Sequence, residues 1–292
     1  MTIRSRPDRC PGVLRPWIAD DGALVRLRLV GGVLPTDALR SLLVIAAAHA
    51  DGTVQLTTRG NLQLRGIEHA GGCVAPSLVD ALEAAGLVPS RSHELVRNVM
   101  VSPMTGRLGG RADLRRTARE LDRLLCADPA FSALAGRFLF VLDDGRGDVA
   151  ARPLDLGLVA VDAHTAQIRA GSGHWGPLVT LDHAAEALLD HARAFLARRG
   201  EGGTASWHVD ELPGGGAELL EHPPARDPRT HVSALPPPYG IMTQDDGRGA
   251  HHLAVPDGLL TPELAATVLE RAGAEVIVTP WRSIVVPDLE IP

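Results

Sequence analysis

Lysine is absent from the sequence, so all 29 basic residues are arginine. Schiff-base chemistry through a lysine amine is therefore excluded, and any anion site must use the planar guanidinium group, which suits carboxylates. The net charge of −6 argues against a general nucleic-acid-binding protein, so the expected partners are small molecules or proteins. No apolar run approaches the ~20 residues that span a bilayer, and Met1 to Cys10 is polar. We therefore expect a cytoplasmic protein without membrane contact.

Cysteine is scarce as well. The three cysteines, Cys10, Cys73 and Cys126, are widely separated and form no Cys-x-x-Cys pair. Because a 4Fe-4S cluster normally takes four thiolates, this chain lacks the ligands for one, and we predict no metal site of its own. His251 and His252 are adjacent, so on a strand they would point to opposite faces and could not both bind one metal ion without distortion. A histidine-carboxylate iron site that uses one of them remains a weaker alternative.

The 292 residues, of which 45% are hydrophobic, can fold as two or three modules with a substantial core. Gly22 to Ile67 has the pattern strand, turn, helix, strand, and Val25, Leu27 and Leu29 alternate with Arg26 and Arg28. This period of two places both arginines on one face of a strand.

A similar pattern recurs between His251 and Val286. Aligned without gaps, Leu27 falls on Leu253 and Gly32 on Gly258, and after a deletion of about four residues Val54 falls on Val276. Two copies indicate a pair of domains related by a pseudo-twofold axis, because a solenoid needs more repeats. Chance similarity of two strand-helix-strand units is the alternative.

The chain between the copies has its own pattern. Helical spacing of apolar residues in 112–126 and 182–199 predicts two amphipathic helices, and the apolar runs 138–142 and 156–161 have the length of strands. Residues 222–239 carry six prolines and read as a linker.

The stretch from Val54 to Ile67 is the most informative candidate site. If it is one continuous strand, its apolar residues face a core, and the opposite face carries a row of hydrogen-bonding side chains. That row comprises Gln55, Thr57, Arg59, Asn61, Gln63 and Arg65. Alternation alone fits an ordinary solvated strand equally well.

These residues also carry a family resemblance. Thr57–Gln63 followed by Arg97-Asn98-Val99 resembles the ferredoxin-like half-domain and the start of the siroheme domain in sulfite and nitrite reductases. Cys10-Pro11-Gly12, together with Arg137-Phe138 running into an aspartate- and glycine-rich segment at 143–148, is similar to the precorrin-3B synthase-like members of that family. The resemblance extends over nearly the whole chain.

The resemblance implies an α+β fold with two ferredoxin-like half-domains, 1–96 and 226–292, related by a pseudo-twofold, and a central sulfite/nitrite reductase-like α/β module at 97–225. It also implies that basic and amide side chains hold the carboxylates of a tetrapyrrole, either a substrate or siroheme. The matching positions are Arg59, Arg97 and Arg137. Asn61, Gln63, Arg65 and Asn98 lie beside them, and Arg282 is the candidate from the second copy. No catalytic residue is identified.

Two departures from the family shape the functional expectation. Leu139 stands where sulfite reductases place a second basic residue, which argues against sulfite or nitrite reduction. The four cluster cysteines of the family lie beyond the second half-domain, and Pro292 follows that half-domain closely, so we expect the iron-sulfur module to be missing.

The leading hypothesis is therefore a precorrin-3B synthase-like oxidoreductase of cobalamin biosynthesis. The resemblance implies a monooxygenase-type reaction, in which a precorrin ring is hydroxylated and a lactone forms. One alternative is a non-catalytic tetrapyrrole-binding carrier or accessory protein. Another is a subunit whose iron-sulfur domain or electron donor is a separate chain.

Overall fold

The computed structural model describes residues 8–220 and 224–290, so the outermost residues of the expected half-domains, 1–7 and 291–292, lie outside the described residues. The chain divides into two compact units. We call residues 10–94 with 236–290 the repeat unit, and residues 8–9, 95–220 and 224–235 the central unit. Residues 226–235, expected as part of the linker and second half-domain, thus group with the central unit. In the described ranges, no helix has both the length and the apolar character to cross a membrane.

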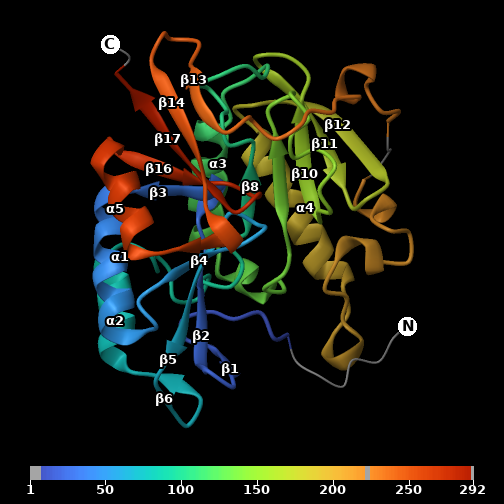
Figure 1. The fold of residues 1–292 in the computed structure, drawn as a ribbon. Helices are drawn as coiled ribbons and strands as arrows, with labels where there is room; N and C mark the ends of the chain where they lie inside the picture. The colour runs from blue at the N-terminus through green and yellow to red at the C-terminus, as the bar shows by residue number, and fades with distance from the viewer. Residues whose placement is uncertain (1–7, 221–223, 291–292) are drawn as a thin grey trace. The chain divides into compact units, whose positions relative to one another are not determined.

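The repeat unit contains two five-stranded sheets. The first has the order β1-β2-β5-β4-β15, and its strands are β1 (Trp17–Ala19), β2 (Gly22–Leu27), β5 (Leu62–Ile67), β4 (Val54–Leu56) and β15 (Leu259–Leu260). The second has the order β13-β14-β17-β16-β3, with β13 (Gly240–Thr243), β14 (Gly249–Ala254), β17 (Ser283–Leu289), β16 (Glu275–Val278) and β3 (Val33–Pro35). Each copy of the repeat therefore gives one strand to the sheet of the other, β3 in one direction and β15 in the reverse (Figure 1).

The strand registers confirm the internal repeat. Leu259 pairs with Gln55, and the equivalent residues of the other copy, Val33 and Ile277, pair in the same way. The bulge between Ala23 and Val25 in β2 likewise recurs between Gly249 and His251 in β14. The two copies thus follow one topology down to a local irregularity of the sheet, as a pseudo-twofold requires.

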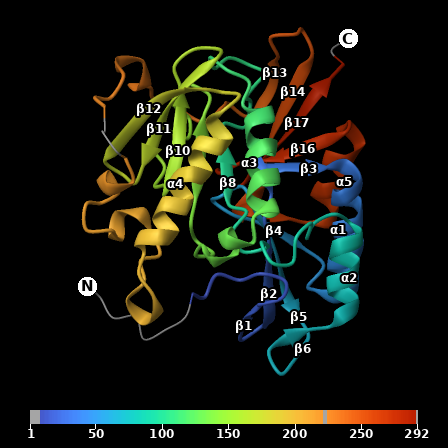
Figure 2. The ribbon, with the colours of Figure 1, turned by 180° about the vertical axis from the view of Figure 1, so that it is seen from behind.

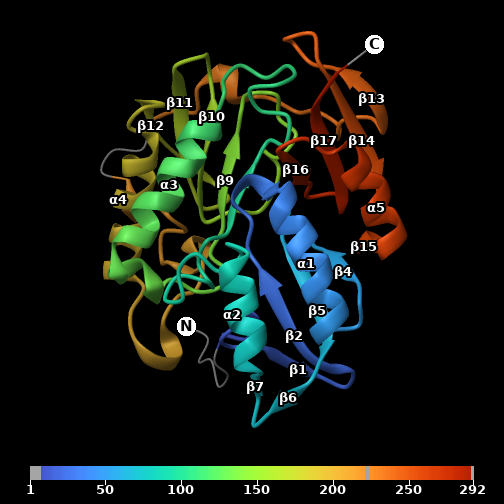
Figure 3. The ribbon, with the colours of Figure 1, turned by 90° about the vertical axis from the view of Figure 1, so that its left-hand side faces the viewer.

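The helices of the repeat unit complete one core. They are α1 (Thr36–His49), α2 (Pro76–Ala84) and α5 (Pro262–Arg271), and Figure 3 shows α1 and α2 lying together. Residues of both copies share a single buried cluster, with Leu42 from α1, Leu64 from β5 and Val268 from α5 among its members. The apolar residues of the alternating strands therefore face the helices, as the period-two pattern predicts. A small hairpin of β6 (His69–Ala70) and β7 (Cys73–Val74) precedes α2.

The expectation of one continuous strand from Val54 to Ile67 is wrong. The segment is a hairpin in which β4 pairs antiparallel with β5. The turn at residues 57–61 is closed by the Thr57 N–H donating to the Asn61 carbonyl at 2.9 Å. Gly60 has φ +69°, a left-handed conformation that breaks a strand at little cost for glycine. The polar side chains of this segment therefore lie on two strands and a turn.

The central unit holds a five-stranded sheet with the order β12-β11-β10-β9-β8. Its strands are β12 (His174–Thr180), β11 (Thr165–Ala170), β10 (Leu156–Ala160), β9 (Phe140–Asp143) and β8 (Val99–Val101). β8, β9 and β10 are parallel, and β11 and β12 continue antiparallel. Figure 2 shows α3 (Arg115–Ala127) and α4 (Ala184–Arg198) side by side on one face of this sheet. Both helices and the strands β9 and β10 were expected from sequence at nearly these bounds.

Candidate anion-binding site

Three side chains form a hydrogen-bonded row on the first sheet of the repeat unit. The strand pairing places Arg26 opposite Gln63, and Gln63 opposite Gln55. Gln63 Oε1 accepts from Arg26 Nε at 3.1 Å and from Arg26 Nη2, and Gln63 Nε2 donates to Gln55 Oε1 at 2.8 Å. Their sequence neighbours Val25, Leu64 and Leu56 are in the core, so this polar row lies on the opposite face of the sheet.

The charge of this polar row is not neutralised. Among the residues that the structure describes, no carboxylate forms an ion pair with Arg26, whose guanidinium is directed at an uncharged amide. Burial lowers the pKa of Arg26 from its ordinary value, Cys10 opposes this effect, and the nearby positive charge of Arg59 lowers the pKa further. Two arginines that are close enough to affect each other make a local positive field that favours an anion.

The turn that carries Arg59 is held from inside the fold. Asn61 is 2% exposed, its Oδ1 accepts from the Leu29 N–H at 2.9 Å, and its own N–H donates to Thr57 Oγ1 at 3.1 Å. Arg59 is half-buried, and its N–H also donates to Thr57 Oγ1. These contacts of Asn61 therefore position the Arg59 backbone at the end of the polar row.

Arg65, expected on the same face as Arg59, instead pairs with Asp21. Its Nε and Nη2 donate to the two carboxylate oxygens at 3.0 and 3.2 Å, and both side chains are largely exposed. The hydrogen bond that Arg65 donates to Asp21 raises the pKa of Arg65 above its ordinary value. Asp21 therefore already balances the charge of Arg65.

The second copy has an apolar version of the polar row. The positions equivalent to Arg26, Gln63 and Gln55 are His252, Val285 and Ile277, which pair in the same register and are at most 2% exposed. Trp281 takes the place of Arg59. Arg282 corresponds to Gly60, is exposed, and shares its left-handed backbone with φ +57°. The equivalent positions of the second half-domain therefore contribute packing.

Arg97 belongs to the central unit and has a carboxylate partner there. Its Nε and Nη2 donate to the two oxygens of Asp122 on α3 at 2.6 and 2.8 Å, and the Arg97 side chain is 9% exposed. Burial alone would lower the pKa of Arg97, but the hydrogen bond and charge of Asp122 raise it above its ordinary value. Arg97 thus connects α3 to β8, the strand that begins just after Arg97.

Asn98 and Arg137 come together within the central unit. Asn98 Nδ2 donates to the Leu95 and Gly136 carbonyls at 3.0 and 2.9 Å, which ties the start of β8 to the residue before Arg137. Arg137 itself is exposed. A ligand role for Arg59, Arg97 and Arg137 acting together remains a prediction, since Arg59 lies in the repeat unit and the other two in the central unit.

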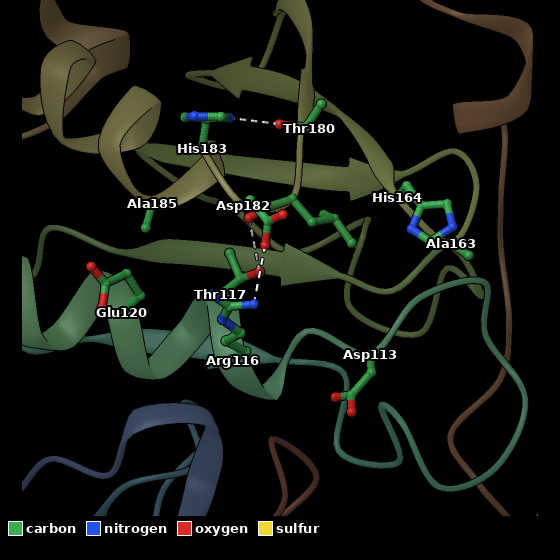
Figure 4. A pocket seen from close by; sticks show the side chains of 11 residues that line it. Asp113, Arg116, Thr117, Glu120, Ala163, His164, Thr180, Asp182, His183 and Ala185 are labelled. Atoms are coloured by element: carbon green, nitrogen blue, oxygen red, sulfur yellow. Dashed lines mark hydrogen bonds and ion pairs between the residues drawn. The ribbon is translucent and has the colours of Figure 1, made fainter.

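A hollow of about 690 Å³ in the central unit involves none of the predicted residues. Its lining comes from α3, the β10–β11 turn and the β12–α4 connection, and Figure 4 shows Arg116 directed at Asp182 and His183 at Thr180. The two pairs are 3.3 and 2.9 Å apart. Asp113, Glu120 and Asp182 outnumber the one arginine, so this hollow does not favour an anion.

The described residues offer no fit for an iron-sulfur cluster with four thiolate ligands. Cys73 is exposed on β7 in the repeat unit, whereas Cys126 is on α3 in the central unit. Within residues 8–220 and 224–290, no three histidine, cysteine or acidic side chains are placed to hold a metal ion. His252 is buried and directed at Ser283 Oγ, at 2.7 Å from Nε2, while His251 contacts Arg271. The polar row, in contrast, has the donors that carboxylates require.

Arg26 was not among the candidate binding residues predicted from the sequence, and its contact with Gln63 was not predicted either. The signal was present, since Arg26 interrupts an apolar strand between Val25 and Leu27. What the sequence lacked was the strand register that sets Arg26 against Gln63.

Comparisons with known proteins agree with this architecture. Residues 19–71, which contain β2, α1, the hairpin and the whole polar row, match the nitrite/sulfite reductase ferredoxin-like half domain. The chain is 31% identical over 158 residues to a precorrin-3B synthase from Sinorhizobium sp, covering 53% of this chain and 33% of that protein. The first copy of the repeat is thus similar to the ferredoxin-like half domain of nitrite and sulfite reductases.

The other matches to known proteins are similarly partial. It is 30% identical over 144 residues to the ferredoxin–nitrite reductase of Leptolyngbya laminosa, which covers 47% of this chain and 28% of that enzyme. The solved structure of the NirA protein of Mycobacterium tuberculosis matches 97% of this chain and 59% of that one, with a TM-score of 0.74 and 21% identity. The structural likeness supports the fold, and the match spans only about a third of the curated relatives' length.

Proposed function

We propose that this chain binds a polycarboxylate tetrapyrrole through the polar row and Arg59, as a precorrin-3B synthase-like oxidoreductase of cobalamin biosynthesis. The observation that carries the proposal is the unneutralised Arg26 guanidinium held by Gln63 beside a second arginine. Charge-assisted hydrogen bonds contribute about 1.5–3 kcal/mol each, so a few such donors suffice for a ligand with several carboxylates.

The residues of the polar row and Arg59 have different roles in binding the ligand. Gln63 fixes the Arg26 guanidinium through two hydrogen bonds, and Gln55 fixes the Gln63 amide, so little side-chain entropy is lost when a carboxylate binds. Arg59 provides a second positive charge from the turn. The reaction proposed by resemblance is ring hydroxylation with lactone formation, and we assign no catalytic residue.

Titration with uroporphyrin III, followed by its absorption and fluorescence, tests the binding site. Arg26→Gln and Arg59→Ala should each weaken binding by about ten- to hundredfold, which corresponds to ~1.5–3 kcal/mol. Arg123→Ala is the matched control, because Arg123 is an exposed residue of α3 that pairs with Glu120. Affinities equal to wild type in both Arg26 and Arg59 variants would refute the tetrapyrrole site.

The rival function is a tetrapyrrole carrier without turnover. It is favoured because the cysteines in the described part of the chain do not fit the ligand set of an iron-sulfur cluster. Anaerobic purification with iron and sulfide assays and an absorption spectrum separates the two. Bound iron and acid-labile sulfide support the oxidoreductase, whether the ligands are its own or those of a partner chain. A bound tetrapyrrole without iron-sulfur supports the carrier.

A further inference from the structure

The loop that follows β9 in the central unit, residues 143–149, is folded around three buried aspartates. Asp143 is fully hydrogen-bonded by the backbone. Its Oδ1 accepts from the N–H groups of Gly145 and Gly147 at 2.9 Å each, and its Oδ2 accepts from Val149 at 3.1 Å. These three donors stabilise Asp143 as a carboxylate, although burial raises its pKa.

Asp144 takes the one arginine of the loop. Arg146 Nε donates to Asp144 Oδ1 at 3.0 Å and Arg146 Nη2 to Oδ2 at 2.7 Å, and Nη2 also donates to the Leu108 carbonyl. This fork-shaped pair commits the guanidinium to Asp144. No second cation is left for the third aspartate from within the loop.

Asp148 is the third carboxyl group, and only one of its oxygens is satisfied. Oδ1 accepts from Ser102 Oγ at 2.7 Å, at the end of β8. Oδ2 has no hydrogen-bond partner among the described residues although the side chain is 0% exposed. The nearest cation, Arg146 Nε, is 3.8 Å away, beyond hydrogen-bonding distance.

Other charges near the loop do not reach Asp148. Arg111 donates from Nη1 to the Arg229 carbonyl at 2.6 Å, and Arg169 donates from Nη1 to the Ala150 carbonyl, so both are directed at backbone oxygens. With all three aspartates ionised and Arg146 as the one cation within the loop, the loop itself would carry a net charge of about −2, which the charge of Arg169 offsets in part through Asp143. A buried ion without a partner costs several kcal/mol, far more than a buried neutral hydroxyl group.

We propose that Asp148 is a proton-binding site, whose carboxyl group is neutral in the folded protein with the proton on Oδ2, and whose ionisation opens the loop. The proton comes from solvent and returns to it. Burial raises the pKa of Asp148 to about 7, Ser102 and Arg146 oppose the shift, and Asp143 and Asp144 add to it. Since Ser102 Oγ also accepts from the Asp144 N–H at 3.2 Å, the proton lies where the loop joins β8.

The sign of the pH effect follows from this assignment. The unfolded chain loses the Asp148 proton near pH 4, whereas the folded chain keeps it until about pH 7. Between these values the folded state binds more protons, so the site stabilises the fold at low pH and this contribution decreases as pH rises to about 7. Above that value the charged Oδ2 requires water, and the loop must loosen to admit it.

Hydrogen exchange of the full chain at pH 5.5 and 8.5, corrected for intrinsic rates, tests the proposal. Amides of Gly145, Gly147 and Val149 in the wild type should lose protection about tenfold or more at pH 8.5. Asp148→Asn, which is neutral at every pH, should retain similar protection at both. Asp162→Asn is the control, because Asp162 is half-exposed and pairs with Arg229.

Direct titration of the wild type, with aspartate labelled at the carboxyl carbon and read by NMR, keeps the proposal testable even if a variant fails to fold. One aspartate signal titrating near pH 7 supports the assignment. If every aspartate signal titrates below pH 5, or if Asp148→Asn shows the same pH-dependent exchange as wild type, Asp148 is ionised in the folded protein and the proposal is wrong.

Discussion

The carbonyl oxygen of Val278 occupies the space that a β-carbon on Gly32 would need. The twofold-related contact is present as well, with Leu56 O at 3.1 Å from the corresponding point on Gly258. Both glycines also have φ +72°. Each copy of the repeat therefore packs backbone on backbone against the hairpin of the other, at the point where the sheets exchange strands.

Gly32→Ala should consequently destabilise the protein by about 2–5 kcal/mol, from the left-handed backbone and the clash together. Gly52→Ala is the matched control, because Gly52 has φ +84° but nothing within 4 Å of its hypothetical β-carbon. That change should cost only ~1–2 kcal/mol. Urea unfolding monitored by circular dichroism measures both, and equal losses would show that backbone conformation alone requires glycine at position 32.

Arg97→Ala should lower the free energy of unfolding by about 2–4 kcal/mol, because it leaves Asp122 without its partner in a mostly buried site. This loss of stability should be slightly smaller than for a fully buried ion pair, since Asp122 is 23% exposed. Arg123→Ala removes an exposed i,i+3 pair of the same helix and should cost ~0–1 kcal/mol. An Arg97→Ala protein as stable as wild type with weakened uroporphyrin III binding would restore the ligand role that the sequence predicts for Arg97.

Arg282→Gly should stabilise the fold by about 0.5–1 kcal/mol, because glycine tolerates the left-handed backbone that Arg282 adopts with φ +57°. Uroporphyrin III affinity should stay within twofold of wild type, since the positions equivalent to Gln63 and Gln55 are the buried apolar residues Val285 and Ile277. Arg248→Gly, in the exposed β13–β14 turn, serves as the comparison and should slightly destabilise the protein. A marked drop in affinity on changing Arg282 would make it a ligand-binding residue.

His252 should make the protein less stable in mild acid. Burial lowers the pKa of His252, while its Nδ1 donates to the carbonyls of Pro237 and Pro238, at 3.0 and 3.1 Å. The unfolded chain then binds more protons than the folded chain as pH falls below about 6.5, so stability decreases there until the folded state also protonates.

His252→Gln should reduce that slope in chemical-unfolding experiments between pH 6.5 and 5, measured as the difference from wild type so that other titrating groups cancel. The same substitution at His69, an exposed residue of β6, supplies the control. A slope identical to wild type in the His252 variant would mean that His252 does not titrate differently in the folded and unfolded chains.

The secondary-structure elements and their repetition can be predicted from the amino-acid sequence. The helix from Thr36 to His49 and the alternation of Val25 and Leu27 with Arg26 depend on periodicities of 3.6 and 2 that neighbouring residues define. The second copy carries the same periodicities, so the pseudo-twofold was predictable from a comparison of the chain with itself. Gly60 also indicated the turn at residues 57–61, although the alternating pattern around it suggested a continuous strand.

Which polar groups pair with one another depends on the three-dimensional fold. The pairing of Arg26 with Gln63, the exchange of β3 and β15 between sheets and the capture of Arg97 by Asp122 all join residues that are more than twenty positions apart. Such contacts depend on strand register and helix placement, which periodicity does not specify. For the same reason the sequence could not separate Arg26, which has no acidic partner among the residues that the structure describes, from Arg97, whose charge is balanced by Asp122.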